Sequence, residues 1–173
     1  MTDRVKQSVF DILTPLIPEA IVYDCFAGTG SMGLECLSRG AAHVTFFEAD
    51  RGAAELLRTN IRTLKLEGRS TVVARDAFRW IADPTSRGNA SLVFLDPPYR
   101  FLRERADELR SLAQNLAARH LALDATVVFR HDAADALELP PFVRADVRTY
   151  GGMTVEFLKA DAHPLMETAG AAT

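Results

Sequence analysis

Along this 173-residue chain, segments whose apolar residues recur at helical spacing alternate with short, continuous apolar runs. Between residues 5 and 16 apolar residues recur at helical spacing, which predicts an amphipathic helix capped near Thr2 or Asp3. Further along, short apolar runs alternate with helical patterns. This alternation predicts an α/β fold with a mostly parallel sheet and helices on both faces, its strands at 21–26, 44–47, 70–74, 92–95 and 125–129.

The helices expected between these strands carry recognisable start signals. Asp50 and Asp76 each follow an apolar run and are typical N-cap residues. The helix after Asp76 is short and ends before Pro84, and a polar loop covers 85–90. Leucines from Leu102 to Leu116 predict one long helix, with Phe78 and Trp80 expected in the core.

The end of the chain changes character. The runs 142–150 and 153–158 predict an antiparallel hairpin that turns at Gly151-Gly152. Beyond it the sequence is rich in Ala, Thr and Gly, which is typical of a frayed end. We therefore expect a single domain over residues 1–160 and a flexible tail over 161–173.

A glycine-rich turn follows the first strand. Gly28 and Gly30 lie where the strand meets the next helix, the geometry of a nucleotide-type cofactor site. Both glycines would let the backbone approach a ligand, and Gly33 would let the helix pack on the sheet. Glu48 ends the next apolar run about 20 residues on, the spacing at which an acid meets ribose hydroxyls.

This spacing fits two cofactors, a nicotinamide dinucleotide and S-adenosylmethionine. Asp24 at the strand end would repel a pyrophosphate and attract an ammonium and a sulfonium, which favours S-adenosylmethionine. It is equally a candidate turn residue or helix cap. Glu48, Asp76 and Asp96 also follow predicted strands, and their convergence with Asp24 favours the cofactor interpretation.

The sequence Asp96-Pro97-Pro98-Tyr99 follows the apolar run 92–95. Two consecutive prolines remove two backbone donors and stiffen the loop. What remains is a carboxylate, fixed carbonyls and an aromatic ring, a set that suits a flat, amino-bearing group. A simple turn after a strand is the alternative, and the acid and the tyrosine flanking the prolines favour a binding loop.

Phe26-Ala27-Gly28-Thr29-Gly30 together with Asp96-Pro97-Pro98-Tyr99 resembles the amino-group methyltransferases of the class I S-adenosylmethionine-dependent fold. The resemblance is closer to the bacterial 16S ribosomal RNA guanine-N2 methyltransferases of the RsmD type. It runs from about Thr2 to Lys159, and its narrower signals are Thr2-Asp3-Arg4-Val5 and Leu37-Ser38-Arg39-Gly40-Ala41. It implies a Rossmann-like fold with a mostly parallel seven-stranded sheet and a C-terminal antiparallel hairpin.

The resemblance also implies roles for individual residues. The catalytic residues would be Asp96, Pro97, Pro98 and Tyr99. The cofactor-binding residues would be Asp24, Phe26, Ala27, Gly28, Thr29, Gly30, Glu48, Ala49, Asp76 and Ala77. Arg4, Arg100 and Arg130 would bind substrate, within a wider candidate rim that also holds Lys6, Arg103, Arg105 and His131 and that is equally well explained as solvated surface charge.

The expected reaction is methyl transfer from S-adenosylmethionine to the exocyclic N2 amine of a guanine in 16S ribosomal RNA. The expected partner is that RNA within a small ribosomal subunit or an assembly intermediate, and the protein is expected to be a monomer. The alternatives are a DNA adenine-N6 or protein-glutamine methyltransferase, a nicotinamide-dependent oxidoreductase, and a catalytically silent ribosome-assembly module.

The chain departs from the family pattern in two places. Members usually carry a basic segment before the Thr-Asp-Arg element, whereas this chain begins at Met1. Many also place an acid after the fifth strand, where this chain has Arg130-His131-Asp132. Because basic contacts supply most non-specific RNA affinity, we expect the chain as printed to bind free RNA weakly.

Composition narrows the remaining possibilities. The formal charge of −3 argues against an autonomous RNA binder held by charge alone. Four histidines without ligand spacing predict no metal site, and Cys25 and Cys36 are expected to be reduced core thiols. No apolar run is long enough for a membrane span and no signal segment is visible, so a cytoplasmic protein is expected.

Overall fold

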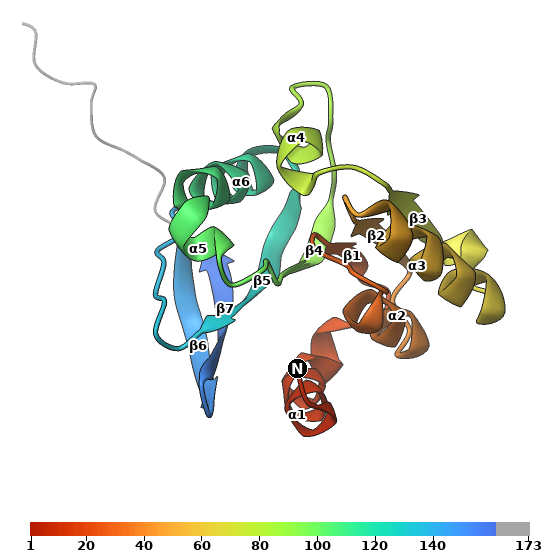
Figure 1. The fold of residues 1–173 in the computed structure, drawn as a ribbon, viewed down its shortest axis with the longest axis horizontal. Helices are drawn as coiled ribbons and strands as arrows, with labels where there is room; N and C mark the ends of the chain where they lie inside the picture. Colours follow the sequence, from red (N-terminus) through yellow and green to blue (C-terminus); the bar gives the residue numbers. More distant parts are fainter. Residues whose placement is uncertain (162–173) are drawn as a thin grey trace, which may run out of the picture.

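A computed structural model describes residues 1–161, which form a seven-stranded sheet with helices on both faces (Figure 1). The strand order is β3-β2-β1-β4-β5-β7-β6. Strands β1 to β5 are parallel, and β7 runs antiparallel to both β5 and β6. The strands are β1 (Ile21–Asp24), β2 (His43–Phe47), β3 (Ser70–Val73), β4 (Ala90–Leu95), β5 (Leu121–Asp132), β6 (Phe142–Tyr150) and β7 (Met153–Ala160).

The helices divide into two layers, one on each face of the sheet (Figure 1). One layer holds α1 (Asp3–Leu13), α2 (Ser31–Ser38) and α3 (Arg51–Thr63), and the other holds α4 (Ala77–Ala82), α5 (Phe101–Glu104) and α6 (Ala106–Arg119). Short 3-10 turns, η1 (Thr14–Leu16) and η2 (Glu67–Arg69), follow α1 and precede β3. The predicted caps are confirmed, because the side chains of Thr2, Asp50 and Asp76 each accept a backbone N–H of the helix that follows.

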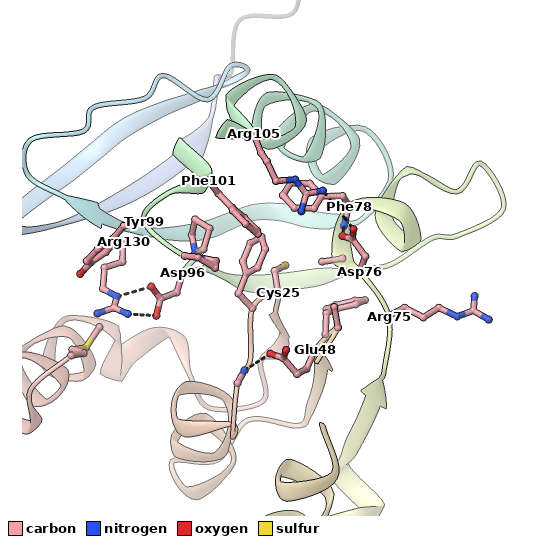
Figure 2. Close-up of a pocket in the computed structure, with 18 residues that line it drawn as sticks. Cys25, Glu48, Arg75, Asp76, Phe78, Asp96, Tyr99, Phe101, Arg105 and Arg130 are labelled. Atoms are coloured by element: carbon pink, nitrogen blue, oxygen red, sulfur yellow. Dashed lines mark hydrogen bonds and ion pairs between the residues drawn. The ribbon is translucent and has the colours of Figure 1, made fainter. Parts of the chain in front are cut away.

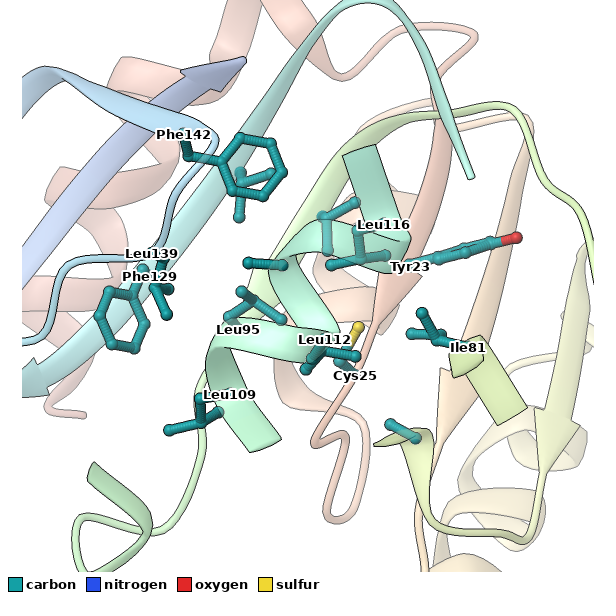
Figure 3. Packing of buried hydrophobic residues seen from close by; sticks show 14 of the residues in the cluster. Tyr23, Cys25, Ile81, Leu95, Leu109, Leu112, Leu116, Phe129, Leu139 and Phe142 are labelled. Atoms are coloured by element: carbon teal, nitrogen blue, oxygen red, sulfur yellow. The ribbon is translucent and has the colours of Figure 1, made fainter. Parts of the chain in front are cut away.

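Strand β4 shows why the apolar runs are continuous rather than alternating. Leu92 and Phe94 belong to the core under α1, α2 and α3, whereas Val93 and Leu95 belong to the core under α4 and α6. A parallel strand covered on both faces buries the side chains of both faces, so the four consecutive positions 92–95 are all apolar. In Figure 3 the leucines of α6 pack close to Leu95, within the core that lies between the sheet and α4 and α6.

The structure corrects several predicted boundaries. The first strand ends at Asp24 rather than at residue 26, and β4 begins at Ala90, inside the predicted loop. Strand β5 covers 121–132 rather than 125–129, because its outer residues pair with β4 at one end and with β7 at the other. The predicted hairpin is confirmed, with β6 and β7 joined at Gly151-Gly152.

The single long helix predicted from Leu102 to Leu116 is wrong. The helix is broken at Arg105, which has φ −133° and ψ 33°, into the short α5 and the longer α6. At the break the Arg105 guanidinium lies over the rings of Phe78 and Phe101. The break therefore turns this side chain back toward the carboxyl edge of the sheet.

The strand order reverses between β1 and β4. From β1 the chain moves outward through β2 and β3, and it then returns to place β4 on the other side of β1. The loops that leave the carboxyl ends of β1 and β4 therefore diverge, and ligands of open α/β sheets bind in the crevice between such loops. The predicted tail lies outside the described residues except for Asp161, and within residues 1–161 no helix is both long and apolar enough to cross a membrane.

Candidate active site

A cavity of about 590 Å³ opens at the carboxyl ends of the central strands. This volume is in the range of small-molecule and cofactor sites. The N-terminus, the segments that follow β1, β2, β3 and β4, and strand β5 contribute residues to its lining (Figure 2). They are Met1, Cys25, Phe26, Gly28, Phe47, Glu48, Ala49, Arg75, Asp76, Ala77, Phe78, Asp96, Pro97, Pro98, Tyr99, Phe101, Arg105 and Arg130.

The glycine turn and Glu48 form one hydrogen-bonded unit at the cavity. The Gly28 amide donates to Glu48 Oε2 at 2.7 Å, and the Asp50 amide donates to Glu48 Oε1 at 2.9 Å. Gly28 and Gly30 have φ of 56° and 96°, so a side chain at either position would be strained. Asn60 of α3 donates to the Thr29 carbonyl at 3.0 Å, which ties the turn to the helix beside it. Glu48 therefore positions the turn as well as facing the cavity.

Gly33 has the packing role predicted for it. A Cβ at this position would overlap the ring of Phe46 and lie 2.9 Å from Val44 Cγ1. Helix α2 therefore lies directly on β2, which brings its N-terminus to the edge of the sheet.

Asp24 does not line the cavity. Its residue is 2% exposed, and its Oδ2 accepts the Gly33 amide of α2 at 3.1 Å. Burial raises the pKa of this carboxyl to about 7, the Gly33 bond opposes the rise, and the charges of Asp96 and Glu48 add to it. The contacts of Asp24 favour the helix-capping role, so any effect on a ligand would act through charge and not through contact.

Aromatic side chains form one wall of the cavity. The ring centroids of Phe26 and Phe78 lie 5.6 Å apart, and that of Phe101 lies 6.3 Å from Phe26. The Arg105 guanidinium covers Phe78 at 4.2 Å and approaches Asp76 Oδ2 at 3.6 Å (Figure 2). Phe78 was predicted as core only, and it is instead both buried and part of this wall.

The Asp96-Pro97-Pro98-Tyr99 loop forms the opposite wall. It leaves β4 and continues into α5, where the Pro98 carbonyl accepts the Phe101 amide at 2.9 Å. Tyr99 is 44% exposed at the mouth of the cavity. The Asp96 carboxylate is held by Arg130, with Nε to Oδ1 at 2.7 Å and Nη2 to Oδ2 at 2.6 Å.

The structure brings most of the predicted site residues together. All four predicted catalytic residues line the cavity, together with six of the predicted cofactor residues, Phe26, Gly28, Glu48, Ala49, Asp76 and Ala77. Ala27, Thr29 and Gly30 belong to the same turn without lining the cavity, and Asp24 is buried behind it.

The predicted substrate rim is not continuous. Arg130 and Arg105 line the cavity, whereas Arg4 and Arg100 do not. Arg100 and Arg103 are turned outward to Glu104 and Asp135. The two remaining members are engaged elsewhere, Lys6 with Ser31 and Glu35, and the buried His131 with Glu156.

Sequence reasoning missed Met1, Cys25, Phe47, Arg75 and Phe101 as cavity residues. Each of these directly adjoins a residue that the sequence analysis had named, and that adjacency was the available signal. Cys25 and Cys36 are both free and buried, as predicted. Within residues 1–161 no group of three or more His, Cys, Asp or Glu side chains is arranged to hold a metal ion.

Comparisons with known proteins agree with this fold. The profile of the family described as conserved hypothetical protein 95 matches residues 1–159. Ribosomal RNA small subunit methyltransferase D of Escherichia coli (strain K12) is 44% identical over 99 residues, which are 57% of this chain and 48% of that protein. The putative rRNA methyltransferase YlbH of Bacillus subtilis (strain 168) is 33% identical over 148 residues, which are 82% of this chain and 74% of that protein. The match to the first of these relatives spans about half of its length.

Solved structures show the same architecture. The putative methyltransferase yhhF from Escherichia coli superposes with a TM-score of 0.82 at 31% identity, covering 94% of this chain and 88% of that one. An RNA methyltransferase from Salinibacter ruber, solved in complex with S-adenosyl-L-homocysteine, shares the fold at a TM-score of 0.68 and 15% identity. The fold is thus the Rossmann-like methyltransferase fold, and this chain belongs to the family described as conserved hypothetical protein 95, that of the RsmD-type methyltransferases.

Proposed function

We propose that this protein transfers a methyl group from S-adenosylmethionine to the exocyclic N2 amine of a guanine in 16S ribosomal RNA. The observation that carries the proposal is the placement of the Asp96-Pro97-Pro98-Tyr99 loop across one cavity from the Gly28 turn and Glu48. The loop suited to a planar amine and the residues suited to a nucleoside, Glu48 and the Gly28 turn, thus lie at the same cavity. The names of the relatives, which act on small-subunit ribosomal RNA, support RNA as the substrate class.

The cavity fits S-adenosylmethionine by its donors, acceptors and shape. A Cβ added to Gly28 would meet no protein atom within 4 Å, so the backbone is open to a ligand at that point. Glu48 offers carboxylate lone pairs to ribose hydroxyls, and Ala77 with Phe78 offers an apolar face to a flat base.

The charges of the cavity also favour this cofactor over a dinucleotide. Glu48, Asp76 and Asp96 line the cavity together with Arg75, Arg105 and Arg130, and within the described residues Glu48 is the one of these three carboxylates that has no arginine partner. An unpaired carboxylate attracts a ligand with an ammonium and a sulfonium and repels a pyrophosphate. Two of the lining arginines are already paired with carboxylates, Arg105 with Asp76 and Glu108, and Arg130 with Asp96. Both guanidinium groups therefore already have carboxylate partners, which makes them less available to bind a phosphate group.

The bound cofactor supplies an electrophilic methyl group, and the protein supplies the position of the amine. Asp96 keeps lone pairs that accept an amine N–H, and the Pro97 carbonyl is a second acceptor on the stiff loop. The exposed Tyr99 ring provides a surface on which a base stacks. As the nitrogen gains positive charge, the Asp96 carboxylate stabilises it, and the proton then leaves to water.

The base must be unpaired or flipped out of a helix to reach this cavity. We expect the protein to act as a monomer on a small ribosomal subunit or an assembly intermediate, where folded RNA presents the base. With a net charge of −3 and dispersed arginines, the protein should bind free RNA weakly, so the shape of the folded RNA should contribute more to substrate recognition than charge does.

The proposal is tested with small ribosomal subunits that lack the modification. The purified protein is incubated with S-adenosylmethionine carrying a labelled methyl group and with subunits, naked 16S RNA, duplex DNA or protein substrate. Digestion and mass spectrometry should find N2-methylguanosine, with more label in subunits than in naked RNA. Label in N6-methyladenosine or in glutamine, or no transfer to any acceptor, would reject the proposed reaction.

Replacing Glu48 with alanine should weaken the binding of S-adenosylmethionine. The change removes the ribose acceptor and also leaves the Gly28 and Asp50 amides without their carboxylate partner. Hydrogen bonds to charged groups are worth about 1.5–3 kcal/mol, so the dissociation constant should rise roughly 10- to 100-fold. Titration calorimetry measures it.

The matched control is Glu55→Ala on α3, whose side chain is 64% exposed and pairs only with arginines of its own helix. This control should bind the cofactor as wild type does. Equal affinity of Glu48→Ala and wild type would show that Glu48 is not part of the cofactor site.

A further inference from the structure

Arg130 of β5 and Asp96 at the end of β4 face each other at the mouth of the cavity (Figure 2). Strands β4 and β5 pair in parallel with Leu95 opposite Phe129. Asp96 follows Leu95 and Arg130 follows Phe129, so these two residues lie side by side. The two contacts of 2.7 and 2.6 Å form a bidentate pair. Such a pair fixes the plane of a carboxylate in a way that a single charge does not.

Each of the three guanidinium nitrogens of Arg130 has a partner. Nη1 lies 3.4 Å from Met153 Sδ, and the group is 6.0 Å from the centre of the Tyr99 ring. The side chain is 17% exposed, against 69% for Arg100 and 72% for Arg103. The pair of N–H groups on Nε and Nη2 is therefore occupied by Asp96, and the side chain is far less accessible to an RNA phosphate than those of the outward-facing Arg100 and Arg103.

The carboxylate benefits from this support in two ways. The terminal torsion of an aspartate is broad, so an unsupported Asp96 would populate several orientations. The charge of Asp96 also contributes to raising the pKa of the buried Asp24, which shows that two acids lie close together at this edge of the sheet. Arg130 limits the rotation of Asp96 and places a positive charge beside this pair of acids, while each carboxylate oxygen keeps a further lone pair for another donor.

We propose that Arg130 is a positioning residue for the methyl transfer, holding the Asp96 carboxylate and the Tyr99 ring in the orientation that receives the target amine. The inference rests on the proposed function. It replaces the substrate-binding role that the sequence suggested for Arg130, and it gives a reason for a basic residue at the position of β5 that lies beside Asp96.

The test is steady-state methylation of small ribosomal subunits by Arg130→Gln and Arg130→Lys. Loss of an orienting contact costs turnover, so kcat of Arg130→Gln should fall about 10- to 100-fold, with the KM for subunits within about threefold. Arg130→Lys keeps the charge without the bidentate geometry and should recover part of kcat. Arg110→Gln on α6, which removes an exposed arginine paired with Asp107, is the control and should match wild type.

Salt dependence separates positioning from phosphate contact. A lost phosphate contact raises KM and reduces the slope of log KM against log salt by about one. That outcome at unchanged kcat, or kinetics equal to wild type, would overturn the positioning role. Wild-type protein without activity on any RNA would instead reject the proposed function, and the positioning role with it.

A thermal double-mutant cycle checks the ion pair without any activity measurement. Asp96→Ala, Arg130→Met and the double variant are melted beside wild type. The double variant should melt at a higher temperature than the sum of the two single changes predicts, because neither partner is left alone. Strictly additive shifts would show that the pair does not form in solution and would overturn the inference.

Discussion

Replacing Asp96 with alanine should reduce methyl transfer by at least about 100-fold while the affinity for S-adenosylmethionine stays within about threefold. Asp96 lies on the loop across the cavity from Glu48 and the Gly28 turn, so its proposed partner is the target amine and not the cofactor. Removing one preorganised group that stabilises developing charge costs 10²–10³ in turnover in roughly comparable cases. Single-turnover methylation of small subunits measures the rate, and calorimetry measures the affinity.

The ion pair with Arg130 complicates the alanine variant, because it leaves a guanidinium that is 17% exposed without its carboxylate. An unpaired, mostly buried charge lowers stability, here by up to about 3 kcal/mol. The double variant Asp96→Ala with Arg130→Met removes this penalty and should recover stability without recovering activity. Recovery of methylation in the double variant would show that Asp96 acts only as a structural partner of Arg130.

The location of the site follows from the sequence because its motifs are local. Gly28, Glu48, Asp76 and Asp96 each follow an apolar run, and the carboxyl ends of parallel strands meet at the same edge of the sheet. Only the alternation of elements is needed to predict that these residues lie together. The final hairpin follows from two strand-like runs that are separated by Gly151-Gly152, whereas the alternation of elements does not determine the order of the strands in the sheet.

The partners of individual side chains could not be predicted in this way. Asp96 and Arg130 are 34 residues apart, and their contact depends on the register between β4 and β5. A shift of one residue in that register would turn Arg130 to the other face of the sheet. The break at Arg105 likewise depends on tertiary contacts with Phe78 and Asp76, whereas the leucine spacing alone is that of one helix.

The location of Asp24 was predicted correctly, but the direction in which its carboxylate points was not. The sequence places it beside the glycine turn, as the structure does, but strand alternation does not tell whether its carboxylate faces the ligand or the helix. The structure turns it toward the Gly33 amide, away from the cavity lining. Any effect of Asp24 on the proposed cofactor site would therefore act through its charge and not through contact.

Replacing Asp24 with asparagine should raise the stability of the protein above pH 7. The folded-state pKa of Asp24 is raised from 3.8 to about 7, first by burial and then by the charges of Asp96 and Glu48, against the opposing Gly33 bond. Between these values the folded state holds a proton that the unfolded state releases. The stability contributed by this group is therefore full below pH 3.8 and is lost as the pH rises through 7.

Asparagine keeps an oxygen for the Gly33 amide and has no charge to bury, so the variant should lack this pH dependence. Urea unfolding without cofactor from pH 4 to 8.5 measures the difference between the two proteins. The difference in the free energy of unfolding should grow from near zero at pH 4 to on the order of 2–4 kcal/mol at pH 8. Asp107→Asn, at a side chain that is 99% exposed, should follow wild type throughout. A constant difference across the range would mean that Asp24 is ionised in the folded state at every pH tested.

The same variant tests why an acid stands at this position. If Asp24 serves only as the cap of α2, asparagine should leave the affinity for S-adenosylmethionine unchanged at all pH values. If its charge attracts the cationic cofactor, wild type should bind more tightly as the pH rises through 7, and the variant should bind about tenfold more weakly at pH 8. Greater stability with weaker binding would show that the protein gives up stability to keep a buried charge near its cofactor, as functional sites often do.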